Sequence, residues 1–286
     1  MHDQIDVALL QQWQGRQETW FDEVTAFPLR ALKASLEAPY AGSGEPGDEL
    51  PPLWHWLYFL PLHARSMLGE DGHARKGEFL PPVPLPRRMW AGGRFEFLSA
   101  LRVGDRIKRV STIVSVKFSQ GRSGRLVFVT VRHEIFVGDV MRVWEEHDIV
   151  YRDAPRPDAP QVEPVAAAAG VWRRQALPDE VLLFRYSALT FNGHRIHYDR
   201  RYATQLEHYP GLVVHGPLVA TLLLDLLQRE LPGRGLKTFS FRAVRPSFDG
   251  APLFLNGELQ ANGQGARLWA SDADGWLTME ATAGLA

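Results

Sequence analysis

The chain reads YSALTFNGHRIHYD at residues 186–199 and PGLVVHGPL at residues 210–218. The first stretch places two histidines and an asparagine in one short polar run. The second ends in a Gly-Pro pair that opens a strongly apolar segment, and proline suits the first turn of a helix because a missing N–H costs little there. A helix N-terminus with free N–H donors, close to groups that transfer protons, is typical of an enzyme that activates a carbonyl compound.

Around these stretches the pattern predicts helices and strands in both halves of the chain. We expect an apolar helix from about Gly216 to Leu231, interrupted helix over residues 1–40, and a short strand near Val181–Tyr186. Runs rich in β-branched and aromatic residues, separated by glycine-containing turns, predict antiparallel meanders. These strands are expected near residues 107–118, 126–136, 140–151, 236–244, 252–260, 266–270 and 276–281.

The fold class that follows is α+β, in two tandem units that each wrap a curved antiparallel sheet around a central helix. The helix leucines at 218, 222, 223, 226 and 227 would face the sheet. Asp153 to Ala169 contains four prolines and an alanine run, which is typical of a linker. We therefore expect an N-terminal domain over 1–155, a linker over 156–169 and a C-terminal domain over 170–286.

Composition limits the classes of function. At 286 residues the chain fits two domains of about 120–140 residues each. A formal net charge of -1 gives no general attraction to nucleic acid or to an acidic membrane surface. There are no cysteines, and no apolar run approaches the roughly 20 residues that span a bilayer. We expect a cytoplasmic protein without a secretory signal.

The two motifs resemble the MaoC-like family of hotdog-fold (R)-specific enoyl-CoA hydratases and hydroxyacyl-thioester dehydratases. That family usually reads D-x-N-P-x-H-x-D, followed by an H-G segment that opens the central helix. Here His197-Tyr198-Asp199 matches H-x-D, and Val214-His215-Gly216-Pro217 matches the H-G segment. Asn192 stands where the family has the aspartate of its catalytic pair, His194 where it has asparagine, and Arg195 where it has proline.

A degenerate N-terminal hotdog before a catalytic one resembles the type 2 hydroxyacyl-thioester dehydratases, and residues 192–199 most resemble mesaconyl-CoA and itaconyl-CoA hydratases. The resemblance implies a hydro-lyase that reversibly hydrates an α,β-unsaturated acyl-CoA. The substrate that the resemblance implies is mesaconyl-C4-CoA or itaconyl-CoA, giving citramalyl-CoA. CoA would be the substrate carrier, with no metal or other cofactor. Hotdog sheets usually pair edge to edge, so the halves should form an intrachain pseudodimer, and a further homodimer is left open.

Three residues are expected to carry the chemistry. His197 is the general acid/base, because an imidazole can both accept and donate a proton near neutral pH. Asn192 would orient the attacking water, although capping a turn is the alternative role for it. The backbone N–H of Gly216 would stabilise the thioester enolate.

The remaining candidates would bind substrate. Arg87 and Arg88 could hold a free carboxylate on the acyl group, and Arg245 could lie near the thioester. His194 is either a rival base or a solvent-exposed side chain. Asp199 is either an acceptor for an imidazole or a turn residue.

Three rival functions stay open at this point. The first is dehydration of 3-hydroxyacyl groups on a carrier protein. The second is a hotdog thioesterase, which would need a carboxylate on or beside the central helix, where Asp225 is the only acidic residue in the middle. The third is a non-catalytic acyl-CoA-binding module, which the missing aspartate favours.

Overall fold

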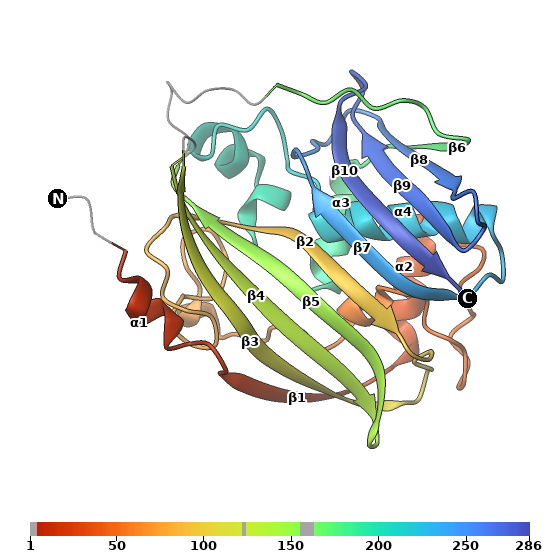
Figure 1. The fold of residues 1–286 in the computed structure, drawn as a ribbon, viewed down its shortest axis with the longest axis horizontal. Coiled ribbons are helices and arrows are strands. Elements are labelled where there is room, and N and C mark those ends of the chain that lie inside the picture. Colours follow the sequence, from red (N-terminus) through yellow and green to blue (C-terminus); the bar gives the residue numbers. More distant parts are fainter. Residues whose placement is uncertain (1–4, 122–123, 155–162) are drawn as a thin grey trace.

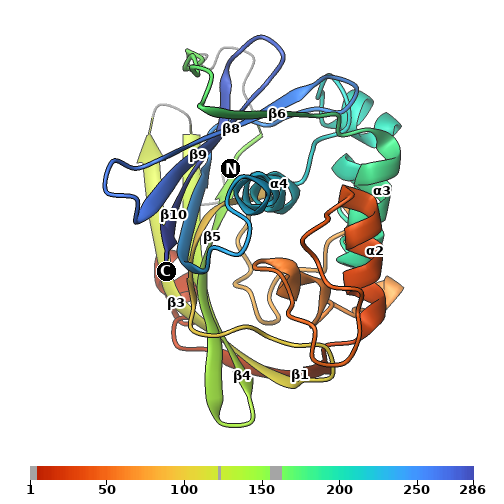
Figure 2. The same ribbon diagram turned by 90° about the vertical axis from the view of Figure 1, so that its right-hand side faces the viewer.

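The strands of the chain form one curved antiparallel sheet that partly encloses the helices (Figures 1 and 2). The computed structural model describes residues 5–121, 124–154 and 163–286. Within this part, ten strands lie in the order β1-β3-β4-β5-β2-β7-β10-β9-β8-β6, so each half of the chain supplies five neighbouring strands. Their bounds are β1 Gln17–Glu23, β2 Arg87–Phe97, β3 Arg106–Gly121, β4 Gly124–Val137, β5 Val140–Arg152, β6 Trp172–Ala176, β7 Leu236–Ala243, β8 Leu253–Leu259, β9 Gly265–Ser271 and β10 Leu277–Leu285.

The two halves meet where β2 pairs with β7, a pairing that we call the seam. Phe95 lies opposite Phe239 across it. Gly92 follows a bulge in β2, and a Cβ at this position would lie 2.5 Å from the carbonyl oxygen of Phe241. Only glycine permits so close an approach of the two backbones. The seam confirms the expected edge-to-edge pairing of the halves within one chain.

The C-terminal strands curve around helix α4, Gly216–Glu230, which Figure 2 shows nearly end-on. The helix packs against β6, β8, β9 and β10. The five leucines that were expected to face the sheet are all buried, as predicted. Three further α-helices are described: α1 Val7–Gln11 beside β3, and α2 Ala26–Leu36 packed against α3 Glu180–Leu189.

The N-terminal sheet holds a much shorter helix. A 3₁₀ turn, η1 Trp54–Leu57, packs into the main apolar core with Trp54 and Leu57 buried. Trp56 meets Phe95 of β2 with ring centroids 5.7 Å apart. Aromatic side chains thus fill much of the space inside this half of the sheet.

The main meander strands and α4 lie where the sequence predicts them, but three local expectations were wrong. The segment at 181–186 is part of α3, because the Asp179 side chain accepts the N–H of Leu182 and caps a helix there. Strand β1 lies inside the region expected to be helical, and β6 was not expected. Both end the sheet, where half-exposed strands lack a clear apolar alternation.

Residues 155–162, which include the first part of the linker expected over 156–169, lie outside the described residues. The following residues are attached to the C-terminal sheet: Ala167 N–H donates to the Gly275 carbonyl at 2.9 Å, and Leu277 N–H donates to Val165 at 2.7 Å. No helix in the described part of the chain is both long and apolar enough to cross a bilayer.

Candidate active site

The polar motif runs from the end of α3 to the start of α4 and brings His197 beside that start. His197 ends a 3₁₀ turn, η3 Arg195–His197, and its side chain is buried. Its ring stacks on the ring of His215 with centroids 3.7 Å apart and planes inclined by 18°. Because His215 immediately precedes α4, the imidazole of His197 lies next to the first N–H groups of that helix.

The hydrogen bonds of His197 fix which ring nitrogen can accept a proton. Nδ1 lies 2.7 Å from the carbonyl oxygen of Val213. A carbonyl oxygen only accepts, so Nδ1 carries the hydrogen and Nε2 of the neutral ring keeps its lone pair. Burial lowers the pKa of His197 to about 4, with a further contribution from His73. At neutral pH the side chain is therefore an uncharged base.

The ring of His215, on which His197 stacks, is itself held by a hydrogen bond. Its Nε2 shares a hydrogen bond of 2.8 Å with the hydroxyl of Ser187 on α3, and both side chains are buried. Burial keeps the pKa of His215 well below its usual value. The sequence reasoning missed Ser187. Its position in the run 186–199, ahead of the histidines of that run, was the available signal.

A loop of the N-terminal half packs directly on the motif. Gly72 has φ +86°, and a Cβ added to it would lie 1.9 Å from the Gly193 carbonyl oxygen, so both the conformation and the contact require glycine. The Arg195 N–H donates to the Asp71 carbonyl at 2.9 Å, and its guanidinium donates to the Glu70 carbonyl at 3.0 Å. The site is therefore built from both halves of the chain.

This loop adds Asp71 and His73, which the sequence reasoning missed. The Asp71 carboxylate accepts from His73 twice, from the backbone N–H at 3.0 Å and from Nδ1 at 2.9 Å. The ring of His73 lies 4.0 Å from that of His194, which is 5.2 Å from that of His197. Burial and the charge of Arg88 lower the pKa of His73 to about 4. Burial would raise the pKa of Asp71, but the bonds and charge of His73 bring it below the usual range.

Asn192 occupies a half-buried place at the turn before His194. Its Oδ1 accepts the backbone N–H of His194 at 3.0 Å, which is the turn-capping role considered as the alternative. Burial lowers the pKa of His194 strongly, and neighbouring His73 adds to this effect. His194 is therefore a neutral ring inside the histidine cluster, by which we mean His73, His194, His197 and His215, rather than a solvent-exposed one.

We expect Asn192→Asp to retain activity, because a carboxylate oxygen accepts the same N–H of His194 and keeps the turn. Asn192→Ala should lower kcat, since the turn that orients the histidines loses its cap. Steady-state rates of the two variants check this. Equal losses in both variants would show that the amide NH₂ group is what matters.

Gly216 lies where the seam meets α4. A Cβ on Gly216 would stand 3.8 Å from the carbonyl oxygen of Trp90 on β2, and no hydrogen bond of the Gly216 N–H is found within the described ranges. Its N–H is thus available to a substrate oxygen at the positive end of the helix.

The three arginines that were expected to bind substrate lie in different surroundings. Arg87 binds Glu207 through its carboxylate at 2.7 Å and its carbonyl at 2.9 Å, so its guanidinium holds the chain after the π-helical turn η4, Tyr202–Leu206. Arg245 lies 3.7 Å from Asp272 at the surface. Arg88 forms no ion pair with any carboxylate that the structure describes.

Asp199 is a turn residue. It accepts from the Arg195 guanidinium at 2.7 Å and from the Tyr202 N–H at 3.0 Å, and these bonds lower its pKa. No hydrogen bond links it to an imidazole among the described residues, so of the two roles considered for it the geometry favours the turn residue. The carboxylate caps the following helical turn instead.

Asp225 is engaged in structure rather than directed to the histidines. It is fully buried, pairs with Arg174 of β6, and accepts from Arg229 at 2.9 Å. It lies nine residues beyond Gly216, roughly 13 Å along the helix axis. This placement disfavours the thioesterase alternative.

A second buried network lies in the N-terminal half, between η1 and β5. The Glu145 carboxylate is 2.9 Å from His55 Nε2 and accepts the indole N–H of Trp56 at 3.1 Å. His147 Nε2 lies 3.2 Å from the other oxygen. Burial would raise the pKa of Glu145, but His147 and His55 hold it well below its usual value. The carboxylate fastens η1 to the sheet.

Two groups of side chains bring atoms that can bind metals within 4.8 Å of one another: Asp71 with His73 and His194, and Glu145 with His133 and His147. Hydrogen bonds already occupy both carboxylate oxygens of Asp71 and Oε2 of Glu145, whose Oε1 lies 3.2 Å from His147 Nε2. The expectation of no metal stays a prediction.

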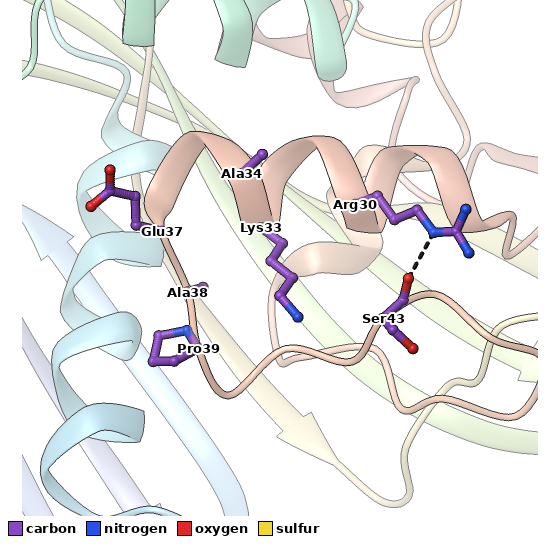
Figure 3. Close-up of a pocket in the computed structure, with 7 residues that line it drawn as sticks. All are labelled: Arg30, Lys33, Ala34, Glu37, Ala38, Pro39 and Ser43. Atoms are coloured by element: carbon purple, nitrogen blue, oxygen red, sulfur yellow. Dashed lines mark hydrogen bonds between the residues drawn. The ribbon is translucent and has the colours of Figure 1, made fainter.

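Two hollows in the surface lie away from the histidine cluster. One, of about 460 Å³, follows the end of α2, where Arg30 and Lys33 donate to backbone carbonyls of the next loop (Figure 3). The other, of about 750 Å³, lies over the seam and is lined by Arg94, Lys117 and Phe241 among others. None of their lining residues belongs to the cluster.

Comparisons with known proteins identify the family of the chain. The sequence model of the family hydroxyacyl-thioester dehydratase type 2 matches residues 53–249. The chain is 46% identical over 274 residues to the mesaconyl-C(4)-CoA hydratase of Chloroflexus aurantiacus, covering 94% of this chain and 95% of that protein. The chain therefore belongs to the hydroxyacyl-thioester dehydratase type 2 family, and the predicted enzyme class, a hydro-lyase, is confirmed.

Solved structures show the same fold at low identity. A MaoC-like dehydratase superposes with a TM-score of 0.71 at 15% identity, covering 96% of this chain and 99% of that one. A conserved Mycobacterium tuberculosis protein, described as having a double hotdog fold, superposes with a TM-score of 0.60 at 15% identity and 96% coverage of each chain. The predicted double hotdog fold is confirmed.

Proposed function

We propose that this protein reversibly adds water to the double bond of mesaconyl-C4-CoA, giving citramalyl-CoA. The observation that carries the proposal is the neutral His197 imidazole, with Nε2 free, stacked beside the start of α4. The 46% identity to a protein named mesaconyl-C(4)-CoA hydratase supports the choice of substrate.

The chemistry requires one base and one oxyanion donor. Nε2 of His197 takes a proton from water while the water oxygen bonds to the β carbon of the acyl group. The electrons of the double bond move toward the thioester oxygen, which the Gly216 N–H stabilises. The imidazolium then returns the proton to the α carbon, so that water has been added and His197 is neutral again.

No step in this scheme calls for a metal, because the helix N-terminus polarises the thioester and the imidazole moves the proton. We expect dialysis of the enzyme against EDTA to leave the hydration rate unchanged. A loss of rate that added zinc or magnesium restores would contradict this prediction.

A reducing compartment suits a chain without cysteines, and we propose the cytoplasm.

The test follows the conjugated enoyl-thioester absorbance of mesaconyl-, itaconyl- and crotonyl-CoA, with free thiol measured in parallel. Loss of the band without thiol release is the expected result, fastest for mesaconyl-C4-CoA. Thiol release would instead make the protein a thioesterase. Binding of all three thioesters without turnover would make it a non-catalytic module.

A further inference from the structure

Two side chains at the start of β2 and the end of β5 stand opposite each other beside the site. Arg88 is the cross-strand neighbour of Tyr151, so their side chains leave the same face of the sheet. Tyr151 is fully buried, and its hydroxyl makes no hydrogen bond of good geometry with the described residues, although the Arg88 side chain lies close enough to interact with it. A buried polar group without a partner is costly, and in a native protein it calls for a ligand or another explanation.

The surroundings of this hydroxyl are positively charged. Burial raises the pKa of Tyr151, and the charge of Arg88 and the interaction of its side chain with the hydroxyl oppose this rise. The ammonium of Lys76 is 5.4 Å from the Tyr151 ring. Burial lowers the pKa of Lys76, and the Arg88 charge lowers it further.

No nearby acid balances these cations among the residues described. Asp71 is the acidic group beside them, but His73 already donates to both of its oxygens. Lys76 donates to two backbone carbonyls, of Val83 at 3.0 Å and of Leu85. Neither Lys76 nor Arg88 forms an ion pair with a carboxylate among the described residues, and only Lys76 is held by backbone carbonyls.

The position relative to the reacting atoms suits one part of the substrate. Arg88 precedes Trp90 by two residues on β2, which places it on the same face and roughly 6–7 Å away. The Trp90 carbonyl in turn lies beside Gly216, where the thioester oxygen would sit. A short diacid with its thioester at Gly216 would extend its other end toward Arg88.

We propose that Arg88 and Tyr151 form a subsite for the free carboxylate of the acyl group, which makes the enzyme selective for dicarboxylic acyl thioesters. This assignment rests on the proposed function. The planar guanidinium matches a carboxylate through paired N–H donors, and the phenol adds an O–H donor. Lys76 contributes charge without direct contact.

The experiment measures kcat/KM for mesaconyl-C4-CoA and for crotonyl-CoA, which lacks the second carboxylate, in Arg88→Met and Tyr151→Phe. We expect Arg88→Met to lower the value for mesaconyl-C4-CoA by about 10²-fold or more and to leave hydration of crotonyl-CoA nearly unchanged. Tyr151→Phe, which removes one oxygen and keeps the ring, should act in the same direction more weakly. Arg88→Lys should recover part of the loss.

Arg94→Met is the matched control, because this arginine lies on the same strand but is exposed and paired with Asp148 at 2.7 Å. The subsite assignment is wrong if the wild type turns over mesaconyl-C4-CoA and Arg88→Met changes kcat/KM equally for both substrates. It is also wrong if Arg88→Met changes kcat/KM for neither substrate. Wild-type enzyme that hydrates crotonyl-CoA but not mesaconyl-C4-CoA would overturn it as well. Silence of the wild type on both would remove the proposed function itself.

Discussion

Replacement of His197 by alanine is expected to lower kcat by about 10²–10⁴-fold, because it removes the group that both takes and returns the proton. The neutral ring with a free Nε2 has no substitute at the start of α4: His215 is stacked against it and shares its Nε2 with Ser187. His194 lies further along the cluster and is itself held neutral by burial. The measurement is hydration of mesaconyl-C4-CoA at saturating substrate.

The pH profile adds an independent readout. The pKa of His197 is lowered to about 4, so the ring stays a base as the pH falls from neutral. We expect kcat/KM to remain level down to about pH 5 and to fall below it, since protonation removes the lone pair.

His63→Ala is the control, because this partly exposed histidine of the N-terminal half lies 3.9 Å from Glu78 and away from the cluster. It should behave like the wild type. A change of less than about threefold in His197→Ala would contradict the assignment of the base.

Asp225→Asn is expected to lower the free energy of unfolding by about 3 kcal/mol, because it leaves Arg174 and Arg229 without the buried charge that they share. The value lies at the lower end for such pairs, since both arginines reach water. Urea denaturation followed by circular dichroism measures it.

The specific activity of folded Asp225→Asn should match the wild type, because the residue lies away from the histidines. Asp139→Asn in the exposed turn between β4 and β5 is the matched control and should change stability by less than about 0.5 kcal/mol. Loss of a thioesterase activity in Asp225→Asn at unchanged stability would show a catalytic carboxylate instead.

Local patterns were enough to predict much of the sheet and α4. Alternating β-branched residues and glycine turns place the central strands, and the apolar run after Gly216 places the helix. Helix α3 was missed because its apolar residues, from Val181 onward, also suit a strand. The Asp179 cap was the signal that would have decided between them.

The site was predicted only where its residues are close in sequence. His73 and Asp71 come from a loop far from the motif, and only the packing of Gly72 on Gly193 brings them there. Adjacent strand residues point to opposite faces, so Arg87 and Arg88 could not both face the same site. The sequence analysis predicted that both arginines would bind substrate, and applying the period of two to this strand would have excluded one of them.

The seam has a consequence for how such an enzyme can change over time. In a pair of identical subunits, every substitution would occur in both copies, and a loop that helps one site would be repeated at the other. Here the joined halves carry different sequences around one shared sheet. The N-terminal half could therefore shorten its helix to η1 and gain the Asp71 loop without altering the half that holds His197. Tandem fusion gives independent freedom to supporting and reacting parts of the same molecule.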